Sequence, residues 1–252
     1  MPAPDAFSWT LVSLRPRGGH DGLRHAAARH GGRLLALSPW ALQPRHDDGA
    51  RQQLEAALEA EVLIFTSPAA VRAAATLQPL RPRRGQQWLA VGAGSAAALR
   101  RAGVEDVQAP RRMDSEGLLA LPALAGAPRV GLVTAPGGRG LIAATLAARG
   151  SEVRRADVYA RVPLPPNATA LARLRALSGP ACLALSSAEA LERVIGHWPA
   201  EAGDALRRCA VVAASERLAA LARGHGMAPV ALADGPRPAA LATAAAALVA
   251  HS

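Results

Sequence analysis

Residues 61–71 read EVLIFTSPAAV, and residues 181–191 read ACLALSSAEAL. In both stretches a short apolar run ends in two small polar residues, and helix-forming residues follow directly. An apolar run of four to six residues bounded by Ser or Thr is typical of a strand that is buried on both faces. A hydroxyl residue just before a helical segment is a common N-cap. Each stretch therefore predicts a strand, a tight loop and a helix.

The same pattern recurs along most of the chain. Further short apolar runs lie at 9–14, 33–37, 88–91, 129–133 and 209–213. Between the runs lie segments in which Leu and Ala recur at three- and four-residue steps, with Arg on the opposite side. Strands that alternate with helices predict an α/β fold, in which helices cover parallel sheets. An all-β or all-helical fold does not fit this alternation.

An internal repeat indicates two copies of one α/β unit. The segment Leu14-Arg15-Pro16-Arg17-Gly18-Gly19 has a counterpart in Val133-Thr134-Ala135-Pro136-Gly137-Gly138. Likewise, Phe65-Thr66-Ser67 has a counterpart in Leu185-Ser186-Ser187. The two copies account for nearly the whole length, and each has the size of an ordinary domain. The sequence thus predicts two similar parallel-sheet α/β domains.

The order of the repeated segments permits two divisions of the chain. One is a single cut near residue 125. In the other, the chain begins domain 1, builds all of domain 2, and returns to finish domain 1. Two proline-punctuated extended stretches, 38–44 and 158–166, suit the two crossings of the second division. We favour this division, with residues 1–41 plus 163–252 as domain 1 and residues 42–162 as an inserted domain 2.

Composition limits the class of protein and of partner. Of the 252 residues, 50% are apolar and 19% are charged, which is typical of a globular protein. The net charge is +10, and every basic residue is arginine, whose planar fork suits carboxylates and phosphates. An anionic partner is expected, although charge alone does not choose among a nucleic acid, a membrane surface and a polyacidic small molecule.

Targeting signals and cysteine chemistry are also constrained. No apolar run approaches the length of a membrane span, and the opening residues MPAPDAFSW lack the features of a secretory signal. Cys182 and Cys209 lie in apolar runs and are predicted to be buried thiols. We expect a cytoplasmic protein without membrane contact.

Small hydroxyl residues follow the predicted strands repeatedly. In α/β folds these positions face ligands, because helix N-termini there present unpaired amides. Each hydroxyl is either a simple N-cap or one of several donors for an anion. The glycine-rich segment 136–140 is either a tight turn or a loop that places Arg139 at a helix start. The candidate hydroxyl donors are Ser67, Ser95, Ser186 and Ser215.

Conventional catalytic and cofactor motifs are missing. None of the seven histidines is spaced to pair with a nucleophile or a metal ligand. The segment 92–97 mimics a dinucleotide fingerprint, but no acidic residue follows at the end of the next predicted strand, near 104–108. Tyr159, the only tyrosine, lies in an expected crossing segment. Its side chain either packs the connector or presents a phenol to a ligand.

These segments together resemble the uroporphyrinogen-III synthase family. The resemblance covers nearly the whole chain and depends on the order and spacing of several segments rather than on one specific motif. The segments are VLIFTSPAAVRAA (62–74), AVGAGSAAALRRAGV (90–104), DSEGLLALPAL (114–124), GGRGLIAATLAARGSEVRRADVYAR (137–161), LALSSAEALERV (183–194) and VVAASERLAALARGHG (211–226).

The resemblance implies two α/β domains joined by a two-stranded linker, with the active site in the inter-domain cleft. It implies that the enzyme cyclises hydroxymethylbilane, a linear tetrapyrrole with eight carboxylates, to uroporphyrinogen III plus water in haem biosynthesis. Ring D is inverted through a spiro-pyrrolenine, and the enzyme is a lyase without cofactor or metal. The bilane also closes unaided to the uninverted isomer, so much of the task is conformational selection.

The resemblance also assigns residues. Tyr159 matches the tyrosine of the linker strand, which assists departure of the hydroxyl. Arg15, Ser67, Ser95, Ser186 and Ser215 match the family's substrate-binding positions. Arg139 is added to the substrate-binding set because of its expected place at a helix start. The chain departs from the family at 134–136, where an Arg-Gly pair is common, and at 213–215, where Gly-x-Thr-Thr is usual.

Two other classes of function stay open at this stage. A non-catalytic two-lobed sensor for an anionic small molecule shares the same α/β architecture. Nucleic-acid binding is disfavoured, because the arginines are scattered and only seven aromatic residues are available for stacking. The expected partner is therefore the small-molecule substrate alone, and the chain is expected to be a monomer.

Overall fold

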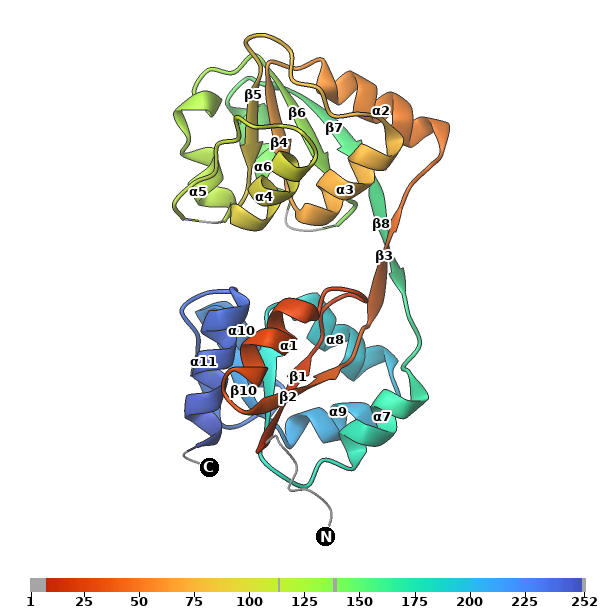
Figure 1. The fold of residues 1–252 in the computed structure, drawn as a ribbon, viewed down its shortest axis with the longest axis vertical. Coiled ribbons are helices and arrows are strands. Elements are labelled where there is room, and N and C mark those ends of the chain that lie inside the picture. The colour runs from red at the N-terminus through yellow and green to blue at the C-terminus, as the bar shows by residue number, and fades with distance from the viewer. Residues whose placement is uncertain (1–7, 113, 138–139, 251–252) are drawn as a thin grey trace. The chain divides into compact units, whose positions relative to one another are not determined.

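A computed structural model describes residues 8–112, 114–137 and 140–250 (Figure 1). The chain separates into two compact units. Unit 1 comprises Met1–Ala41 and Val162–Ser252, and unit 2 comprises Leu42–Arg161. The division into a discontinuous domain 1, residues 1–41 plus 163–252, and an inserted domain 2, residues 42–162, stays a prediction.

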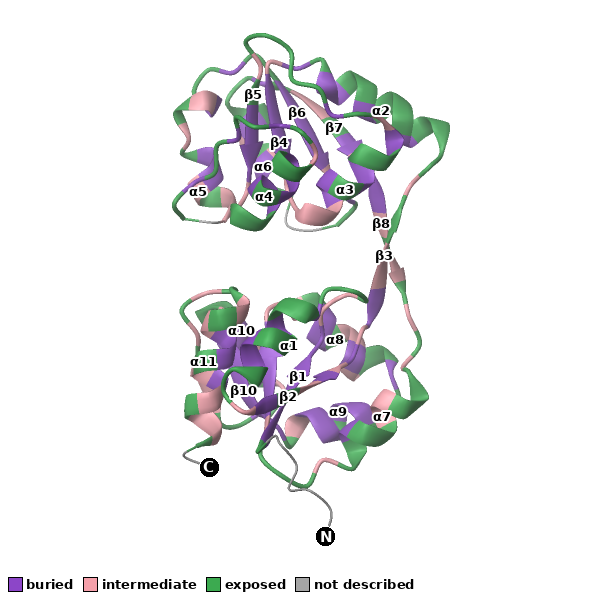
Figure 2. Ribbon diagram, viewed as in Figure 1, coloured by how far each residue is buried: buried purple, intermediate pink, exposed green. Residues whose placement is uncertain are grey.

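Unit 1 contains a five-stranded sheet in the order β11-β10-β9-β1-β2. All of its strand pairs are parallel. Leu11 of β1 lies opposite Cys182 of β9 on one side and opposite Leu34 of β2 on the other. Every residue of β1 and β10 is buried, as expected for strands covered on both faces (Figure 2). The strands are β1 (Trp9–Ser13), β2 (Gly32–Ala36), β9 (Ala181–Leu185), β10 (Ala210–Ala213) and β11 (Val230–Leu232).

Helices cover both faces of this sheet. Successive strand residues point to opposite sides, so the apolar strands present side chains to a core on each face. Leu11 packs with Leu23 and Leu241 in a core beneath α1 (Asp21–Ala28) and α11 (Pro238–Val249). Val12 belongs to the core on the other face. That core is covered by α7 (Ala168–Arg175), α8 (Ala188–His197), α9 (Ala200–Arg207) and α10 (Glu216–Gly224).

Unit 2 contains a four-stranded parallel sheet in the order β5-β4-β6-β7. The strands are β4 (Val62–Phe65), β5 (Gln87–Ala90), β6 (Arg129–Thr134) and β7 (Glu152–Asp157). On one face, Phe65 stacks on Trp88 with ring centroids 5.5 Å apart, beneath α2 (Asp48–Leu58), α3 (Pro68–Leu77) and α4 (Ala93–Arg101). On the other, Ile64 and Leu132 pack against α5 (Ser115–Leu119), the 3-10 helix η1 (Pro122–Leu124) and α6 (Leu141–Ala148).

The two sheets share one topology. In unit 1 the order β10-β9-β1-β2 corresponds to β5-β4-β6-β7 in unit 2, so β1 matches β6 and β9 matches β4. These are the strands that precede the repeated sequence segments. The fold class predicted from the sequence, two similar parallel-sheet α/β units, is confirmed.

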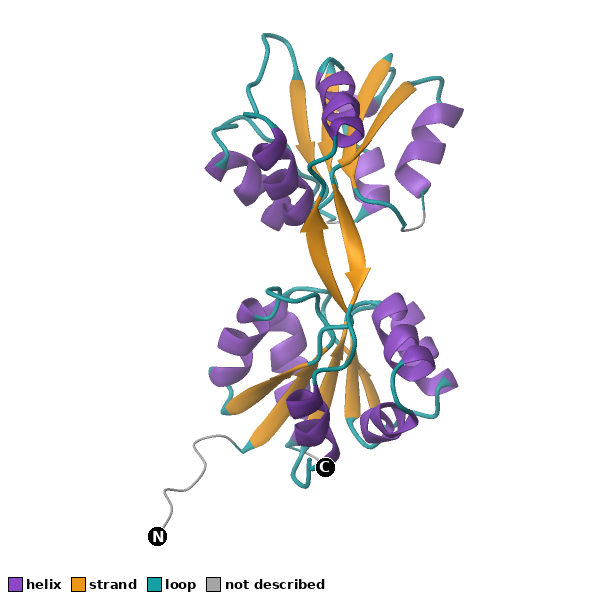
Figure 3. Cartoon of the chain, turned by 90° about the vertical axis from the view of Figure 1, so that its right-hand side faces the viewer, coloured by secondary structure: helices purple, strands orange, loops and turns teal. Residues whose placement is uncertain are grey.

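Two further strands, β3 (Trp40–Pro44) and β8 (Tyr159–Pro163), pair in a separate two-stranded sheet. Figure 3 shows them running in opposite directions. The chain passes from one unit to the other within these strands, after Ala41 and after Arg161.

The sheets differ from the sequence-based expectation at three places. The expected strand at 104–108 forms only one bridge, Leu89 to Gln108. Strands β7 and β11, both at sheet edges, were not predicted. Strand β11 is apolar but only three residues long, and β7 has little apolar character. In β7, which reads EVRRAD, only Ala156 is buried.

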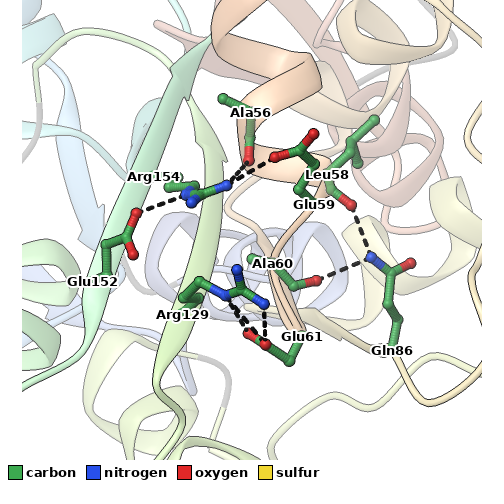
Figure 4. A network of polar contacts seen from close by, with 9 residues as sticks. All are labelled: Ala56, Leu58, Glu59, Ala60, Glu61, Gln86, Arg129, Glu152 and Arg154. Carbon is green, nitrogen blue, oxygen red and sulfur yellow. Dashed lines mark hydrogen bonds and ion pairs between the residues drawn. The ribbon is translucent and has the colours of Figure 1, made fainter.

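A polar network joins α2, β4, β6 and β7 of unit 2 (Figure 4). The Arg129 guanidinium donates to both carboxylate oxygens of Glu61. Arg154 lies between Glu152 and Glu59, at 2.7 and 2.9 Å. The hydrogen bond from Arg129 lowers the pKa of Glu61. Because both side chains of this pair are over 40% exposed, solvent and salt screen the interaction.

We therefore expect Arg129→Gln to lower the urea midpoint of unfolding only slightly at pH 7. A carboxyl whose folded-state pKa is lowered stabilises the fold above its unfolded pKa, and this contribution is lost as pH falls through the folded value. The difference between variant and wild type should thus shrink as pH falls below the unfolded pKa of Glu61, and it should also shrink in 1 M salt. A midpoint loss that is large and independent of pH would contradict a screened ion pair.

Candidate active site

Unit 2 contains a pocket of about 230 Å³ at the carboxyl ends of β4 and β6. Ligands bind parallel α/β sheets at this edge, because loops and helix N-termini gather there. The walls combine hydroxyl, guanidinium and apolar groups. The lining residues are Thr66, Ser67, Ser115, Leu132, Thr134, Ala135, Gly137, Gly140, Leu141, Ile142, Ala143, Arg155, Tyr159 and Arg161.

Two residues that the sequence singled out independently, Tyr159 and Ser67, meet in this pocket. The Tyr159 Oη atom lies 3.2 Å from Ser67 Oγ, although the residues are 92 positions apart. Tyr159 is the first residue of β8 and is 6% exposed. Ser67 caps α3, and its Oγ accepts the Ala70 N–H at 3.1 Å. The cap fixes Ser67, and Ser67 in turn orients the phenol.

A second hydroxyl pair lies beside the first. Thr66 Oγ1 donates to Thr134 Oγ1 at 2.9 Å, which links the ends of β4 and β6. Thr134 belongs to a segment that departs from the family pattern, yet its hydroxyl lies in the pocket wall. Arg155 donates to the Ala135 carbonyl at 2.9 Å and pairs with Asp157, so its guanidinium is fixed beside the same loop.

Helix α6 adds positive potential to the pocket. Its N-cap, Gly140, has φ +64° and supplies no side-chain acceptor. The first-turn amides of a helix carry a partial positive charge and favour an anion. Leu141 and Ile142, the first residues of the helix, line the pocket. Arg139, which was expected at this helix start, lies outside the described residues.

The other predicted substrate-binding residues are not among those that line this pocket. Ser95 is in the first turn of α4 and only 4% exposed, with Gly92 as the N-cap. Ser186 follows β9, and Ser215 caps α10 by accepting the Leu218 N–H at 3.4 Å. Arg15 follows β1 and donates to the Pro236 carbonyl at 3.2 Å, and burial lowers its pKa. Ser186, Ser215 and Arg15 belong to unit 1.

A buried histidine in unit 1 was not predicted from the sequence. His20 is 6% exposed, at the start of α1. Its Nδ1 lies 3.0 Å from Ser13 Oγ, and its Nε2 lies 2.8 Å from Ser38 Oγ. Ser13 ends β1 and pairs with Ala36 in β2, which brings Ser38 alongside. The spacing of the histidines along the sequence does not predict this cluster, because the cluster depends on the register of β1 and β2.

The environment of His20 disfavours its charged form. Burial, and then the charges of Arg24 and Arg15, lower its pKa to about 4, while Asp21 opposes the shift. In the unfolded chain His20 takes up a proton near pH 6.5, whereas in the folded chain it stays neutral. Its contribution to stability is thus complete above pH 6.5 and falls as pH drops towards 4.

We expect this difference to cost about 2 to 3 kcal/mol of unfolding free energy between pH 7.5 and 4.5. Urea unfolding of wild type and His20→Gln at several pH values measures it, because Gln does not titrate. The wild-type curve should fall more steeply through this range. Parallel curves would show that His20 is protonated alike in both states.

Neither of the two cysteines presents an exposed thiol. Both are free and buried. Burial raises the pKa of Cys182 to about 12 and that of Cys209 to about 11, so both thiols stay protonated at neutral pH. The prediction of buried thiols is confirmed.

Other features bear on the class of protein. Within the described ranges, no three or more His, Cys, Asp or Glu side chains form a group that could hold a metal ion. Nor does any helix in those ranges have the length and apolarity needed to cross a bilayer. The fold and the pocket define a two-unit parallel α/β protein whose site offers hydroxyls, guanidinium groups and a helix N-terminus to an anionic ligand.

Comparison with known proteins identifies the family. Residues 21–243 match the family model described as uroporphyrinogen-III synthase HemD. This chain therefore belongs to the uroporphyrinogen-III synthase family, which acts in the biosynthesis of porphyrins and haem. The resemblance noted in the sequence is confirmed.

Solved structures show the same fold. A mutant uroporphyrinogen III synthase from the extremely thermophilic bacterium Thermus thermophilus is similar with a TM-score of 0.63 and 20% identity, over 96% of this chain and 99% of that chain. A uroporphyrinogen-III synthetase from Helicobacter pylori is similar with a TM-score of 0.58 and 15% identity, over 95% of this chain and 99% of that chain.

Proposed function

We propose that this chain is a uroporphyrinogen-III synthase that converts hydroxymethylbilane to uroporphyrinogen III and water, a lyase reaction. Family membership carries the proposal, and the Tyr159–Ser67 pair in the unit 2 pocket supports it. A reaction that also proceeds unaided needs few catalytic groups, because binding that selects one folded form of the substrate provides much of the effect.

Tyr159 is the proton donor in this proposal. The C–O bond of the ring A hydroxymethyl group breaks, and the leaving oxygen takes the phenol proton and departs as water. Ser67 donates its O–H to Tyr159 Oη and so stabilises the phenolate that remains. This arrangement is compatible with the contacts of Ser67, because its Oγ can accept the Ala70 N–H while its own proton is donated elsewhere.

The pocket suits one or more of the substrate's eight carboxylates. A carboxylate accepts hydrogen bonds only, so its site must supply donors. Thr134 Oγ1 accepts the Thr66 O–H and so keeps its own proton for a ligand. The first turn of α6 offers further uncharged donors, and the Arg155 guanidinium lies at a fixed position beside them. Among the described substrate-binding residues predicted from the sequence, only Ser67 lines this pocket, where it supports Tyr159. Ser95 has the weakest support, because it is buried within α4.

The proposal predicts that the protein accelerates bilane consumption far above the rate of unaided ring closure, with saturation as bilane is increased. The test is a time course of bilane loss with and without the protein. A matched sample of Tyr159→Phe shows whether the acceleration depends on the pocket. Saturable binding without any acceleration would instead indicate a non-catalytic binding module.

The inter-domain active site that the family resemblance implies stays a prediction. So do the substrate-binding roles of Arg15, Arg139, Ser186 and Ser215.

A further inference from the structure

Unit 1 contains a cavity of about 240 Å³ that the site in unit 2 does not include. It lies beside the carboxyl end of the edge strand β2, next to the start of α7. By volume it has room for several water molecules, and so for a short carboxylate-bearing arm. The lining residues are Arg17, Ala36, Leu37, Ser38, Pro165, Asn167, Ala170 and Trp198.

The contacts of His20 determine which way the Ser38 hydroxyl points its proton. Ser13 is fully buried, so its O–H must find an acceptor. Ser13 Oγ accepts the Arg15 N–H at 3.4 Å, and its remaining described partner is His20 Nδ1. Ser13 therefore donates to Nδ1. In a neutral imidazole the other nitrogen then carries the proton, so Nε2–H donates to Ser38 Oγ at 2.8 Å.

This chain of hydrogen bonds leaves the Ser38 proton without an acceptor among the described residues. Because Ser38 Oγ accepts from His20, its own O–H is available to an acceptor in the cavity that Ser38 lines. His20 does not line this cavity, so it acts on a ligand only through Ser38. It is a positioning residue rather than a binding residue.

The other polar side chains of the wall are also donors. Trp198 lines the cavity, and its buried Nε1–H has no hydrogen-bond partner in the described part of the chain. Arg17, also in the wall, is exposed and positively charged. The amide oxygen of Asn167 is already occupied by the Ala170 N–H at 2.9 Å. The lining residues include no acidic one, so no side-chain carboxylate of the wall would repel an anionic guest.

We propose that this cavity binds a carboxylate group, with Ser38 and Arg17 as donors and His20 as the positioning residue. The identity of the natural ligand, one carboxylate arm of the bilane, rests on the proposed function. The site itself does not, because its donors would bind a simple carboxylate without turnover.

The test is a citrate titration of the whole protein labelled with nitrogen-15, at constant ionic strength maintained with sodium chloride. The sequence has four tryptophans, and Trp198→Phe assigns the Trp198 indole signal. We expect citrate to shift this signal and to leave the other three nearly unchanged. Citrate that moves no indole signal, or that moves all four alike, overturns the proposal.

Matched variants test the named donors. Arg17→Gln and Ser38→Ala should weaken citrate binding at least fivefold. The controls Arg175→Gln and Ser178→Ala, which change exposed residues of unit 1 outside this cavity, should bind as wild type does. Equal affinity in all four variants overturns the assignment of the donors.

The role of His20 has its own readouts. The ring nitrogen spectrum should show the Nε2–H tautomer, and His20→Leu should weaken citrate binding. His20→Gln, which keeps a donor and an acceptor, should restore part of the affinity. An Nδ1–H tautomer overturns the positioning role. If His20→Leu fails to fold, the tautomer of His20 still tests its positioning role, and the Ser38→Ala titration still tests the donor that it positions.

Failure of this site and failure of the proposed function are distinguishable. Citrate binding at Trp198 without bilane conversion refutes the function and keeps the site. Bilane conversion without citrate binding at Trp198 refutes the site and keeps the function.

Discussion

Replacing Tyr159 with phenylalanine should lower kcat by about a hundredfold, because general acid catalysis by a positioned side chain contributes roughly that factor or more. The change removes one oxygen atom and keeps the buried ring, so the packing of β8 is maintained. The loss should therefore appear in kcat with little change in the melting temperature. The measurement is steady-state bilane consumption alongside thermal unfolding.

Ser67→Ala provides the comparison. Ser67 supports the phenol but transfers no proton to the leaving oxygen, so its loss should lower kcat by about tenfold or less. The variant also loses the cap of α3, at a cost of about 1 kcal/mol. Ser187→Ala removes the equivalent cap of α8 and calibrates that stability cost. If Tyr159→Phe and Ser67→Ala lower kcat equally, Tyr159 is not the assisting acid.

Gly131→Ala should destabilise unit 2 by about 3 kcal/mol or more, at the upper end of the cost of overpacking a core. Gly131 lies in the central strand β6, against α2. A Cβ atom there would overlap the Ala57 carbonyl oxygen and the Leu63 side chain. Ala57 and Leu63 are fully buried, and a backbone carbonyl cannot rotate away as a flexible side chain can.

Urea unfolding measures this loss, with Gly179→Ala as the control. Gly179 has open space where its Cβ would lie, and its backbone is outside the left-handed region. The control should match wild type within experimental error. A Gly131→Ala protein as stable as this control would mean that α2 and β6 can separate at little cost.

Much of the fold follows from local sequence patterns. The predicted strand at 62–65 matches the observed strand, and the strand predicted at 181–185 does so as well. Both are four or five apolar residues between polar loops, so one local pattern identifies them. Strand β7 escaped prediction because its Arg154 and Arg155 make ion pairs at the sheet edge rather than apolar contacts.

The candidate site was predictable only where a residue type is itself unusual. Tyr159 drew attention as the sole tyrosine, and Ser67 as a hydroxyl at a strand end. Their contact spans 92 positions and depends on tertiary structure. The His20 cluster shows the same limit, because Ser13 and Ser38 meet only through the parallel register of β1 and β2. Local sequence patterns thus predict single strands and helices, whereas these two sites depend on contacts between residues far apart in the sequence.

Product analysis tests the central claim most directly. Bilane is incubated with the protein, the products are oxidised to porphyrins, and isomers I and III are separated by chromatography. The account predicts mainly isomer III with the protein present and isomer I without it. Isomer I alone in both samples would contradict the claim that this chain directs ring D inversion.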